Sequence, residues 1–393
     1  MAVRKISDDI LAVGAIDWDR RLFDELIPLP YGTSYNAYLV KGQDKIALLD
    51  TVDPAKTERL LRNIKEANVD KIDYIVAHHA EQDHSGSISA VLQLYPEAKV
   101  VTSTKAKKML MDLLLLSEEH FIAVEDKETL SLGNKTLEFH YTPWVHWPET
   151  MVTYLPEDKI LFSCDFLGSH IATSDLFVPN EYLVYNAAKT YFAEIMMPFR
   201  TKVAKNLERI EELQPEIIAP SHGPVYDRPQ FIIDAYKDWT SDTVKNEVVI
   251  PYVSMHGSTE AMVNYLVDAL IEREVGVTPF NLTETDLGSL AESLVDAATI
   301  IIAAPTLLVG PHPAAVYAAY LANALRPKAK FASIIGSYGW GSKMVDNLTA
   351  MLPNLKVELL EPVIVKGFPK KENFEALIQL AEKIQANHQK LNL

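Results

Sequence analysis

The sequence predicts an α/β protein of two domains, a mixed domain over residues 1–245 and a doubly wound parallel sheet over residues 246–393. Two observations predict this division. A polar stretch at 242–247 separates the two parts, and beyond it short apolar runs alternate with helical patterns, which is typical of a parallel sheet with helices on both faces. Before it the pattern is irregular, with hairpin-like turns between short strands. A chain of 393 residues is long enough for each domain to have its own core.

Composition limits the partners and the setting of the protein. The formal net charge is −16, which disfavours a nucleic-acid partner or an anionic membrane. Cys164 is the one cysteine, so we expect no intramolecular disulfide and no cysteine-based metal site. The N-terminus lacks the pattern of a signal peptide, and no apolar run reaches the roughly 20 residues that span a membrane. We therefore expect a cytoplasmic protein that binds neither nucleic acid nor membrane.

The first domain begins with strands and a helix. Apolar runs at 35–40 and 46–50 predict strands joined by a hairpin-like turn at 41–44. The helical pattern at 54–68 starts with proline, which the first turn of a helix tolerates. The later predicted elements are a strand and polar loop over 72–87, helices near 88–95 and 105–116, a strand at 99–102, and alternating strands with hairpin turns over 129–163.

Four potential metal ligands lie within six residues, directly after an apolar strand pattern at 74–77. They are His79, Glu81, Asp83 and His84. Positions 79, 81 and 83 alternate, so these side chains can point the same way, whereas the adjacent Asp83 and His84 would most easily serve different metals. A single histidine is usually structural, but this density of ligands favours a metal site.

Three more potential ligands lie at or near the ends of later strand patterns, where α/β folds carry their chemistry. They are His146, Asp165 and His222. Each by itself is as easily structural as functional. Added to the loop, they give four imidazoles and three carboxylates, a set that suits two borderline metal ions with at least one bridging carboxylate.

The ligand loop resembles the HxHxDH motif of metallo-β-lactamase-fold proteins, with Glu81 in place of the central histidine. His146, Asp165 and His222 follow in the order of that fold. The resemblance implies an αββα sandwich for the first domain. Zinc has no redox chemistry and would suit hydrolysis, whereas an oxygen-rich site with histidines beside a redox cofactor favours iron.

Three loops of the second domain resemble the flavin loops of flavodoxins. The first lies between a strand at 248–253 and a helix at 260–272, where N–H groups and hydroxyls can hold a phosphate. The other two lie at 304–310 and 336–341, also at strand ends. The candidate residues are Ser254, Met255, His256, Gly257, Ser258 and Thr259 in the first loop, Pro305, Thr306, Leu307 and Gly310 in the second, and Ser337, Tyr338, Gly339, Trp340 and Gly341 in the third.

Two features of these loops bear on flavin binding. Tyr338 and Trp340 could stack on the isoalloxazine ring, or they could close the edge of a core. Leu308 and Val309 stand where related proteins often carry asparagine, so the polar contacts of the second loop should differ. The remaining predicted elements are strands at 300–304, 331–335 and 357–365 and helices at 314–325, 343–351 and 372–389.

The order of the two domains, a Glu81-substituted lactamase-like domain and then a flavodoxin-like domain, resembles that of the flavodiiron proteins (A-type flavoproteins). The resemblance implies reduction of O2 to water, of NO to N2O, or of both, at a non-haem di-iron centre supplied with electrons by FMN. It also implies a head-to-tail homodimer or a dimer of dimers, and a small redox donor such as rubredoxin or a reduced deazaflavin.

The resemblance also assigns roles to residues. His79, Glu81 and His146 would hold one iron, Asp83, His84 and His222 the other, and Asp165 would bridge, although relatives differ in whether the residue matching His84 binds. Phe23, His170 and Tyr191 are candidates for the substrate pocket, with Tyr191 as a proton donor, and each has a structural alternative. Trp147 is expected to contact the flavin of the other subunit.

Two other functions remain open at this point. One is a binuclear zinc hydrolase with an accessory flavodoxin-like electron-transfer domain, and the other is an electron carrier in which the metal site is structural. The preference between O2 and NO is also open, because the ligand set is the same for both.

Overall fold

The computed structural model describes residues 3–393, which form two compact units. The first unit contains the chain up to Tyr191 together with Phe199–Thr240, and the second contains Phe192–Pro198 and Ser241–Leu393. The second unit therefore begins slightly before the predicted boundary at 245 and includes a short segment that no sequence pattern marked. None of the helices within residues 3–393 combines the length and the apolar character needed to cross a membrane.

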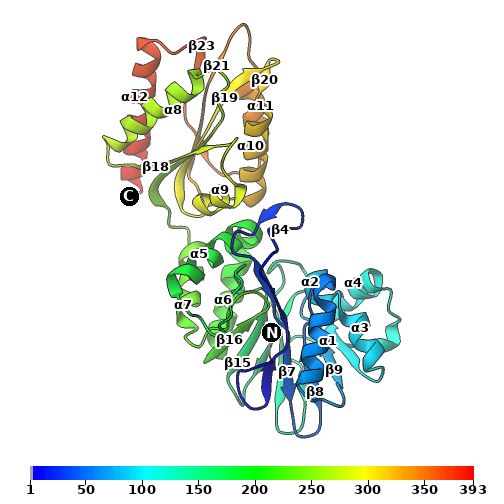
Figure 1. Ribbon diagram of the computed structural model, residues 1–393. Helices are drawn as coiled ribbons and strands as arrows, with labels where there is room; N and C mark the ends of the chain where they lie inside the picture. Colours follow the sequence, from blue (N-terminus) through cyan, green and yellow to red (C-terminus); the bar gives the residue numbers. More distant parts are fainter. Residues whose placement is uncertain (1–2) are drawn as a thin grey trace. The chain divides into compact units, whose positions relative to one another are not determined.

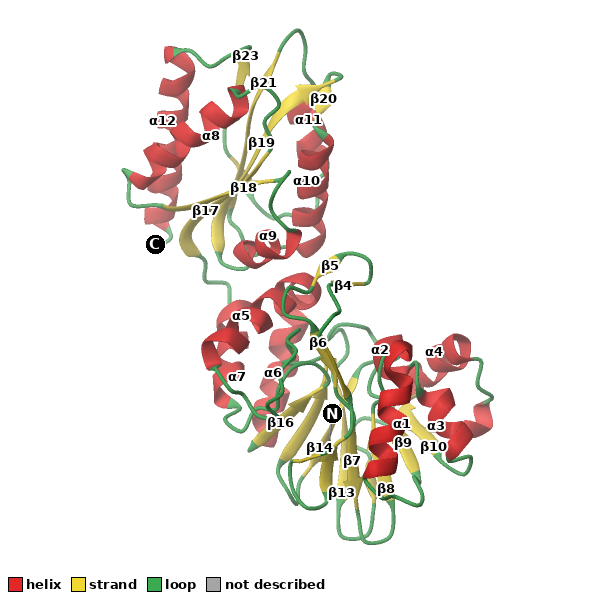
Figure 2. Cartoon of the chain, viewed as in Figure 1, coloured by secondary structure: helices red, strands yellow, loops and turns green. Residues whose placement is uncertain are grey.

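The first unit is built around two sheets (Figures 1 and 2). The larger sheet has the order β1-β2-β7-β8-β9-β10-β11 and the smaller has the order β12-β13-β14-β15-β16. The strands of the larger sheet are β1 (Arg4–Lys5), β2 (Ile10–Ala12), β7 (Tyr38–Lys41), β8 (Ile46–Leu49), β9 (Tyr74–Val76), β10 (Lys99–Ser103) and β11 (Phe121–Val124). Those of the smaller sheet are β12 (Thr129–Ser131), β13 (Thr136–Tyr141), β14 (Met151–Leu155), β15 (Ile160–Cys164) and β16 (Ile217–Pro220). Two antiparallel two-stranded sheets accompany them, β3 (Ala15–Asp17) with β6 (Thr33–Tyr35) and, between these in the chain, β4 (Leu22–Phe23) with β5 (Ile27–Pro28).

Helices cover the outer faces of these sheets, which gives the predicted αββα sandwich (Figure 1). The helical segments near the larger sheet are η1 (Pro54–Lys56), α1 (Thr57–Glu66), α2 (Gln82–Ser85), α3 (Ile88–Leu94), α4 (Thr104–Leu114) and η2 (Glu118–His120). Those of the first unit that follow β15 are α5 (Glu181–Tyr191), α6 (Arg200–Leu213) and α7 (Gln230–Thr240). Between α5 and α6, η3 (Phe192–Met196) and most of η4 (Met197–Phe199) belong to the second unit. The sequence patterns did not predict α5 to α7.

The inner strands β7, β8 and β9 of the larger sheet are apolar on both faces, because both faces are covered. On β7, Leu39 packs into the core beneath the helices, whereas Tyr38 and Val40 pack into the core between the two sheets. The parallel pairs β8–β9, β9–β10 and β15–β16 bring the carboxyl ends of their strands to one edge. That edge carries the ligand loops.

The second unit is a parallel sheet with the order β18-β17-β19-β21-β22, and β23 also pairs with β21. Helices α8 and α12 lie on one face, and α9, α10 and α11 lie on the other (Figure 1). This is the predicted doubly wound arrangement. The strands are β17 (Lys245–Tyr252), β18 (Gly276–Asn281), β19 (Ala297–Leu307), β20 (Gly310–Pro311), β21 (Phe331–Tyr338), β22 (Glu358–Leu359) and β23 (Val363–Lys366). The helices are α8 (Ser258–Ile271), α9 (Leu287–Leu294), α10 (Pro313–Leu325), α11 (Met344–Ala350) and α12 (Lys371–Lys390).

Two expectations for this unit were wrong or incomplete. The single strand predicted over 357–365 is two short strands, because Pro362 lacks the N–H that a continuous ladder needs. Strand β18 and helix α9 were missed. Strand β18 is largely exposed at the edge of the sheet and contains Pro279, so it shows no apolar run.

Candidate metal centre and flavin loops

The seven predicted ligands come from five segments of the first unit and converge on one point. His79 follows β9, Glu81 is the N-cap of the short helix α2, and Asp83 and His84 lie on α2 itself. The other three follow the remaining strand ends or connect them: His146 lies between β13 and β14, Asp165 follows β15, and His222 follows β16.

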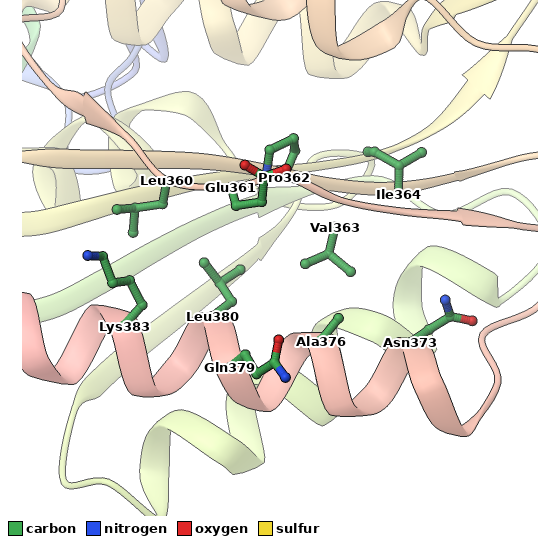
Figure 3. A pocket seen from close by; sticks show the side chains of 10 residues that line it. All are labelled: Leu360, Glu361, Pro362, Val363, Ile364, Asn373, Ala376, Gln379, Leu380 and Lys383. Carbon is green, nitrogen blue, oxygen red and sulfur yellow. The ribbon is translucent and has the colours of Figure 1, made fainter.

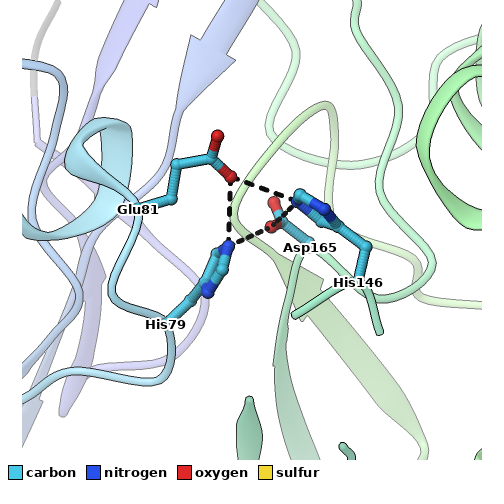
Figure 4. Close-up of side chains that lie close together, drawn as sticks. All are labelled: His79, Glu81, His146 and Asp165. Atoms are coloured by element: carbon cyan, nitrogen blue, oxygen red, sulfur yellow. Dashed lines mark hydrogen bonds and ion pairs between the residues drawn. The ribbon is translucent and has the colours of Figure 1, made fainter. Parts of the chain in front are cut away.

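One group of ligands contains His79, Glu81, His146 and Asp165 (Figure 4). Oε2 of Glu81 lies 3.1 Å from Nε2 of His79 and 3.1 Å from Nε2 of His146. Oδ2 of Asp165 lies 3.5 Å from Nε2 of His79 and 3.4 Å from Nε2 of His146.

A second group contains Asp83, His84 and His222. Asp83 approaches Nε2 of His84 at 3.3 Å and Nε2 of His222 at 3.1 Å. Oδ1 of Asp165 lies 3.0 Å from Nε2 of His84 and 3.2 Å from Nε2 of His222. The two oxygens of Asp165 therefore face different groups.

Several of these buried atoms lack a hydrogen-bond partner within the described chain. They include both carboxylate oxygens of Asp83, Nε2 of His84 and Oδ2 of Asp165. Nε2 of His84 is close to Asp165, yet the two atoms do not have hydrogen-bond geometry. Unpaired polar atoms in a buried site are costly, and nitrogen and oxygen atoms grouped so closely fit the ligand set of two metal ions.

The carboxylates favour positive charge on the imidazoles. Burial lowers the pKa of His222, but Asp165 and Asp83 raise it to about 10. In the same way, burial lowers the pKa of His146, and Asp165 and Glu81 raise it to about 9. Burial raises the pKa of Asp165, but the neighbouring imidazoles hold it well below its usual range. A site that stabilises protons on its nitrogens in this way also stabilises bound cations.

Two buried carboxylates that the sequence did not single out lie behind the ligands. Oε1 of Glu149 accepts a hydrogen bond from Nδ1 of His79 at 2.7 Å. Asp50 accepts hydrogen bonds from the backbone N–H of His78 at 2.9 Å, from its Nδ1 at 2.7 Å and from Oγ of Ser221 at 3.1 Å. Only a weak sequence signal could have located these two residues. Glu149 lies three residues after the candidate ligand His146, and Asp50 ends an apolar strand pattern.

The predicted pocket residues lie beside this centre. Tyr191 donates its hydroxyl hydrogen to Oδ1 of Asp165 at 2.9 Å, and burial raises its pKa well above the usual range. Burial lowers the pKa of His170 well below its usual range, which favours the neutral ring. The centroid of that ring lies 4.8 Å from the ring centroids of Tyr191 and His222. The ring of Phe23 lies 5.2 Å from that of His170. Nε2 of His170 has no hydrogen-bond partner within residues 3–393.

The first and third candidate flavin loops contact each other through their hydroxyls. The first begins after β17 and runs into α8, and the third begins in the last two residues of β21; both strands neighbour β19 in the sheet. Oγ of Ser258 lies 2.8 Å from Oγ of Ser337 at the N-terminus of α8. A Cβ added at Gly257, Gly339 or Gly341 would meet no atom within 4 Å, so these loops border open space. Hydroxyls beside a helix N-terminus and an open glycine-rich border fit a phosphate group and a flat ring.

The second candidate loop is a hairpin between β19 and β20. Leu307 pairs with Gly310, and the two residues between them have positive φ, 47° for Leu308 and 73° for Val309. Such positions ordinarily favour glycine or asparagine. Leu308 is 87% exposed, so this tip presents an apolar side chain where polar contacts to the flavin were expected in relatives.

The second unit also has a groove of about 300 Å³ between the β22–β23 segment and α12 (Figure 3). Leu360, Val363 and Leu380 form part of its lining, together with Glu361 and Lys383. None of the predicted flavin residues lines it.

Several known proteins are similar to the chain over most of its length. A family model described as "ODP family beta lactamase" matches residues 33–223. The nitric oxide reductase of Moorella thermoacetica is 35% identical over 97% of this chain and 98% of its own length. A flavo-diiron protein of Clostridium acetobutylicum is 31% identical over 92% of this chain and 93% of its own.

The chain belongs to the flavodiiron protein family. The structure of rubredoxin oxygen:oxidoreductase from Desulfovibrio gigas covers 99% of both chains with a TM-score of 0.95 at 31% identity. As a flavodiiron protein the chain is an oxidoreductase, and the predicted combination of a metallo-β-lactamase-like and a flavodoxin-like fold is confirmed. The zinc hydrolase alternative is therefore not favoured.

Proposed function

We propose that the protein reduces O2 to water, NO to N2O, or both, at two iron ions that receive electrons from FMN. The observation that carries the proposal is the position of Asp165, whose two oxygens face two separate groups of ligands. When bound, two ferrous ions and one reduced FMN together supply the four electrons that the reduction of O2 to water consumes.

The first unit would hold the metals. His79, Glu81 and His146 would hold one ion, and the carboxylate of Asp165 would be shared with the other. Asp83, His84 and His222 complete the second group. His79, Asp83, His84, Asp165 and His222 are buried, and Glu81 and His146 are each 14% exposed, so the charges of the carboxylates would act on bound cations with little screening.

Tyr191 and His170 would act on the substrate side of the centre. Tyr191 keeps its proton at neutral pH and holds it 2.9 Å from Asp165, where it can restrain that carboxylate and serve as a proton donor. Nδ1 of His170 lies 2.9 Å from Oγ1 of Thr33, which fixes the ring and leaves Nε2 for a further hydrogen bond. Phe23 packs beside His170 and adds an apolar wall suited to a small uncharged gas.

The second unit would bind FMN, and the domain assignment follows, with residues 1–245 for iron and 246–393 for the flavin. The first loop, 254–259, holds the phosphate with its N–H groups and hydroxyls. The ring is held by Pro305, Thr306, Leu307 and Gly310 from the second loop and by residues 337–341 from the third.

Electron supply completes the proposal. Relatives named for rubredoxin support a small redox protein as the donor, and a reduced deazaflavin is the other donor class. A cytoplasmic head-to-tail homodimer, or a dimer of dimers, would bring the FMN of one subunit near the iron of the other. Trp147, whose ring centroid lies 4.8 Å from that of His79 in an edge-on arrangement, would then lie between flavin and metal.

Two measurements test the function. Protein purified under iron-replete conditions should contain two iron ions and one FMN per chain, and the reduced form should consume O2 or NO in a steady-state assay with each gas. Two zinc ions with negligible iron would contradict the proposal. So would a reduced protein that leaves both gases unconsumed, which is the behaviour of a simple electron carrier.

A further inference from the structure

Glu149 is a buried carboxylate attached to the metal centre by one hydrogen bond. Its side chain is fully buried, three residues after His146 in the chain. Oε1 accepts from Nδ1 of His79 at 2.7 Å and from the N–H of Ala80 at 3.1 Å, and Oε2 has no partner within the described residues. A carboxylate placed in this way needs a balancing positive charge.

We propose that Glu149 is a positioning residue of the metal centre, which fixes the orientation of His79 and supplies a fourth buried carboxylate to balance two divalent ions. The proposal rests on the proposed di-iron function. It concerns a residue that does not itself face the centre.

The orientation follows from hydrogen-bond chemistry. An ionised carboxylate can only accept, so Nδ1 of His79 must carry the hydrogen, and its Nε2 keeps a free lone pair. Nε2 is the atom that lies 3.1 Å from Glu81 and 3.5 Å from Asp165. Trp147 packs edge-on against the same ring and limits its rotation. A carboxylate behind a ligating histidine sets both the tautomer and the basicity of the ligand.

Glu149 also contributes its negative charge, whatever the orientation of His79. Glu81, Asp83 and Asp165 carry three negative charges, against four positive charges for two divalent ions. A net positive charge in a buried site is unfavourable, and Glu149 at Nδ1 of His79 supplies a further negative charge that offsets it.

The charge of Glu149 lies beside only one of the two ligand groups. Nδ1 of His222, in the other group, donates at 2.7 Å to the backbone carbonyl of Ser34, which is neutral. The group that contains His79 therefore receives the additional negative charge, and we expect its metal ion to depend more strongly on Glu149.

Two variants separate the two roles. Glu149→Gln keeps the size and an acceptor oxygen but removes the charge, whereas Glu149→Leu removes both. The metal-depleted parent and each variant are titrated with Co²⁺, followed by visible absorption bands. We expect the parent to bind two ions, Glu149→Leu to bind one of them on the order of 10- to 100-fold more weakly with altered bands, and Glu149→Gln to lose less affinity.

The iron-loaded proteins give a second readout. Removing a negative charge favours the less positive ferrous state, so the midpoint potential of the centre should shift in the positive direction in Glu149→Gln. Glu138→Gln is the matched control, because this carboxylate lies on β13 and is not among the grouped ligands. It should leave both the Co²⁺ affinity and the potential unchanged.

These measurements distinguish a failure of the proposed function from a failure of the role assigned to Glu149. A parent that binds no metal would overturn the proposed function and this inference together. A parent that binds two ions, with both variants equal to it in Co²⁺ affinity, absorption and potential, would overturn only the role of Glu149. If Glu149→Leu does not fold, Glu149→Gln decides alone.

Discussion

The candidate metal ligands of the first unit and the candidate flavin loops of the second are built in opposite ways. His79 is completely buried, and its two ring nitrogens approach specific carboxylates. Trp340, in the third flavin loop, is 78% exposed, and the glycines around it border open space. The comparison teaches that the candidate metal centre would depend on particular side chains, whereas the candidate flavin site would depend largely on backbone shape.

Asp165→Ala should have the largest effect, because it removes the one side chain that both ligand groups share. Turnover of O2 and NO should be abolished, while the FMN absorbance stays at the parental level. The steady-state assay and the flavin spectrum check this. Glu216→Gln, on the surface of the same unit, is the control and should be fully active. Normal turnover in Asp165→Ala would refute its bridging role.

Asp50→Ala tests how strongly the stability of the first unit depends on a buried carboxylate outside the candidate ligand set. The substitution leaves the N–H and Nδ1 of His78 without their buried acceptor, so the free energy of unfolding should fall by about 3 kcal/mol. Urea unfolding followed by intrinsic fluorescence measures this. Asp70→Ala, at an exposed position, should change the free energy by less than about 0.5 kcal/mol. Equal midpoints for the two variants would show that Asp50 is dispensable.

The same comparison explains what could be predicted from sequence. The convergence of the candidate ligands in the first unit could be predicted because four of them share one short loop and the others end or connect strands. The roles of Asp50 and Glu149 could not, because each meets its partners only when segments far apart in the chain come together. The flavin loops could be located only by their place after strands, since glycines and serines carry little chemical signal. The edge strand β18 was missed for a related reason, because an exposed strand has no apolar run.

The pKa values of two buried histidines, one in each unit, differ because their neighbours differ. Burial alone would lower both pKa values, but carboxylates raise that of His222 to about 10. His388 on α12 has neutral partners, Oγ1 of Thr299 at 2.7 Å and Oδ1 of Asn246 at 2.8 Å, and burial lowers its pKa to about 4. Buried histidines therefore respond to acid according to their neighbours.

Acid should consequently destabilise the second unit through His388. The unfolded chain binds a proton near pH 6.5 and the folded chain only near pH 4, so stability is complete above 6.5 and falls as the pH drops between these values. The loss should be about 2 to 3 kcal/mol. Urea unfolding at pH 7.5, 6 and 5, followed by circular dichroism, should show a shallower pH dependence in His388→Gln than in the parent. Parallel curves would exclude His388 as the source.

Thr259→Ala should have the smallest effect, because it removes one hydroxyl from a site that we infer to be held largely by backbone groups. Thr259 follows Ser258 at the start of α8, and its Oγ1 lies 3.4 Å from Oγ of Ser337. Loss of one such hydrogen-bonding group is worth about 1 kcal/mol, so the dissociation constant for FMN should rise roughly fivefold. Fluorescence titration of the flavin-depleted protein measures this, with iron content as the check that the first unit is intact. Thr349→Ala on α11, outside the three loops, is the control. An unchanged flavin affinity would count against the phosphate loop, and a complete loss of FMN would mean that this site depends on single side chains as strongly as the metal centre does.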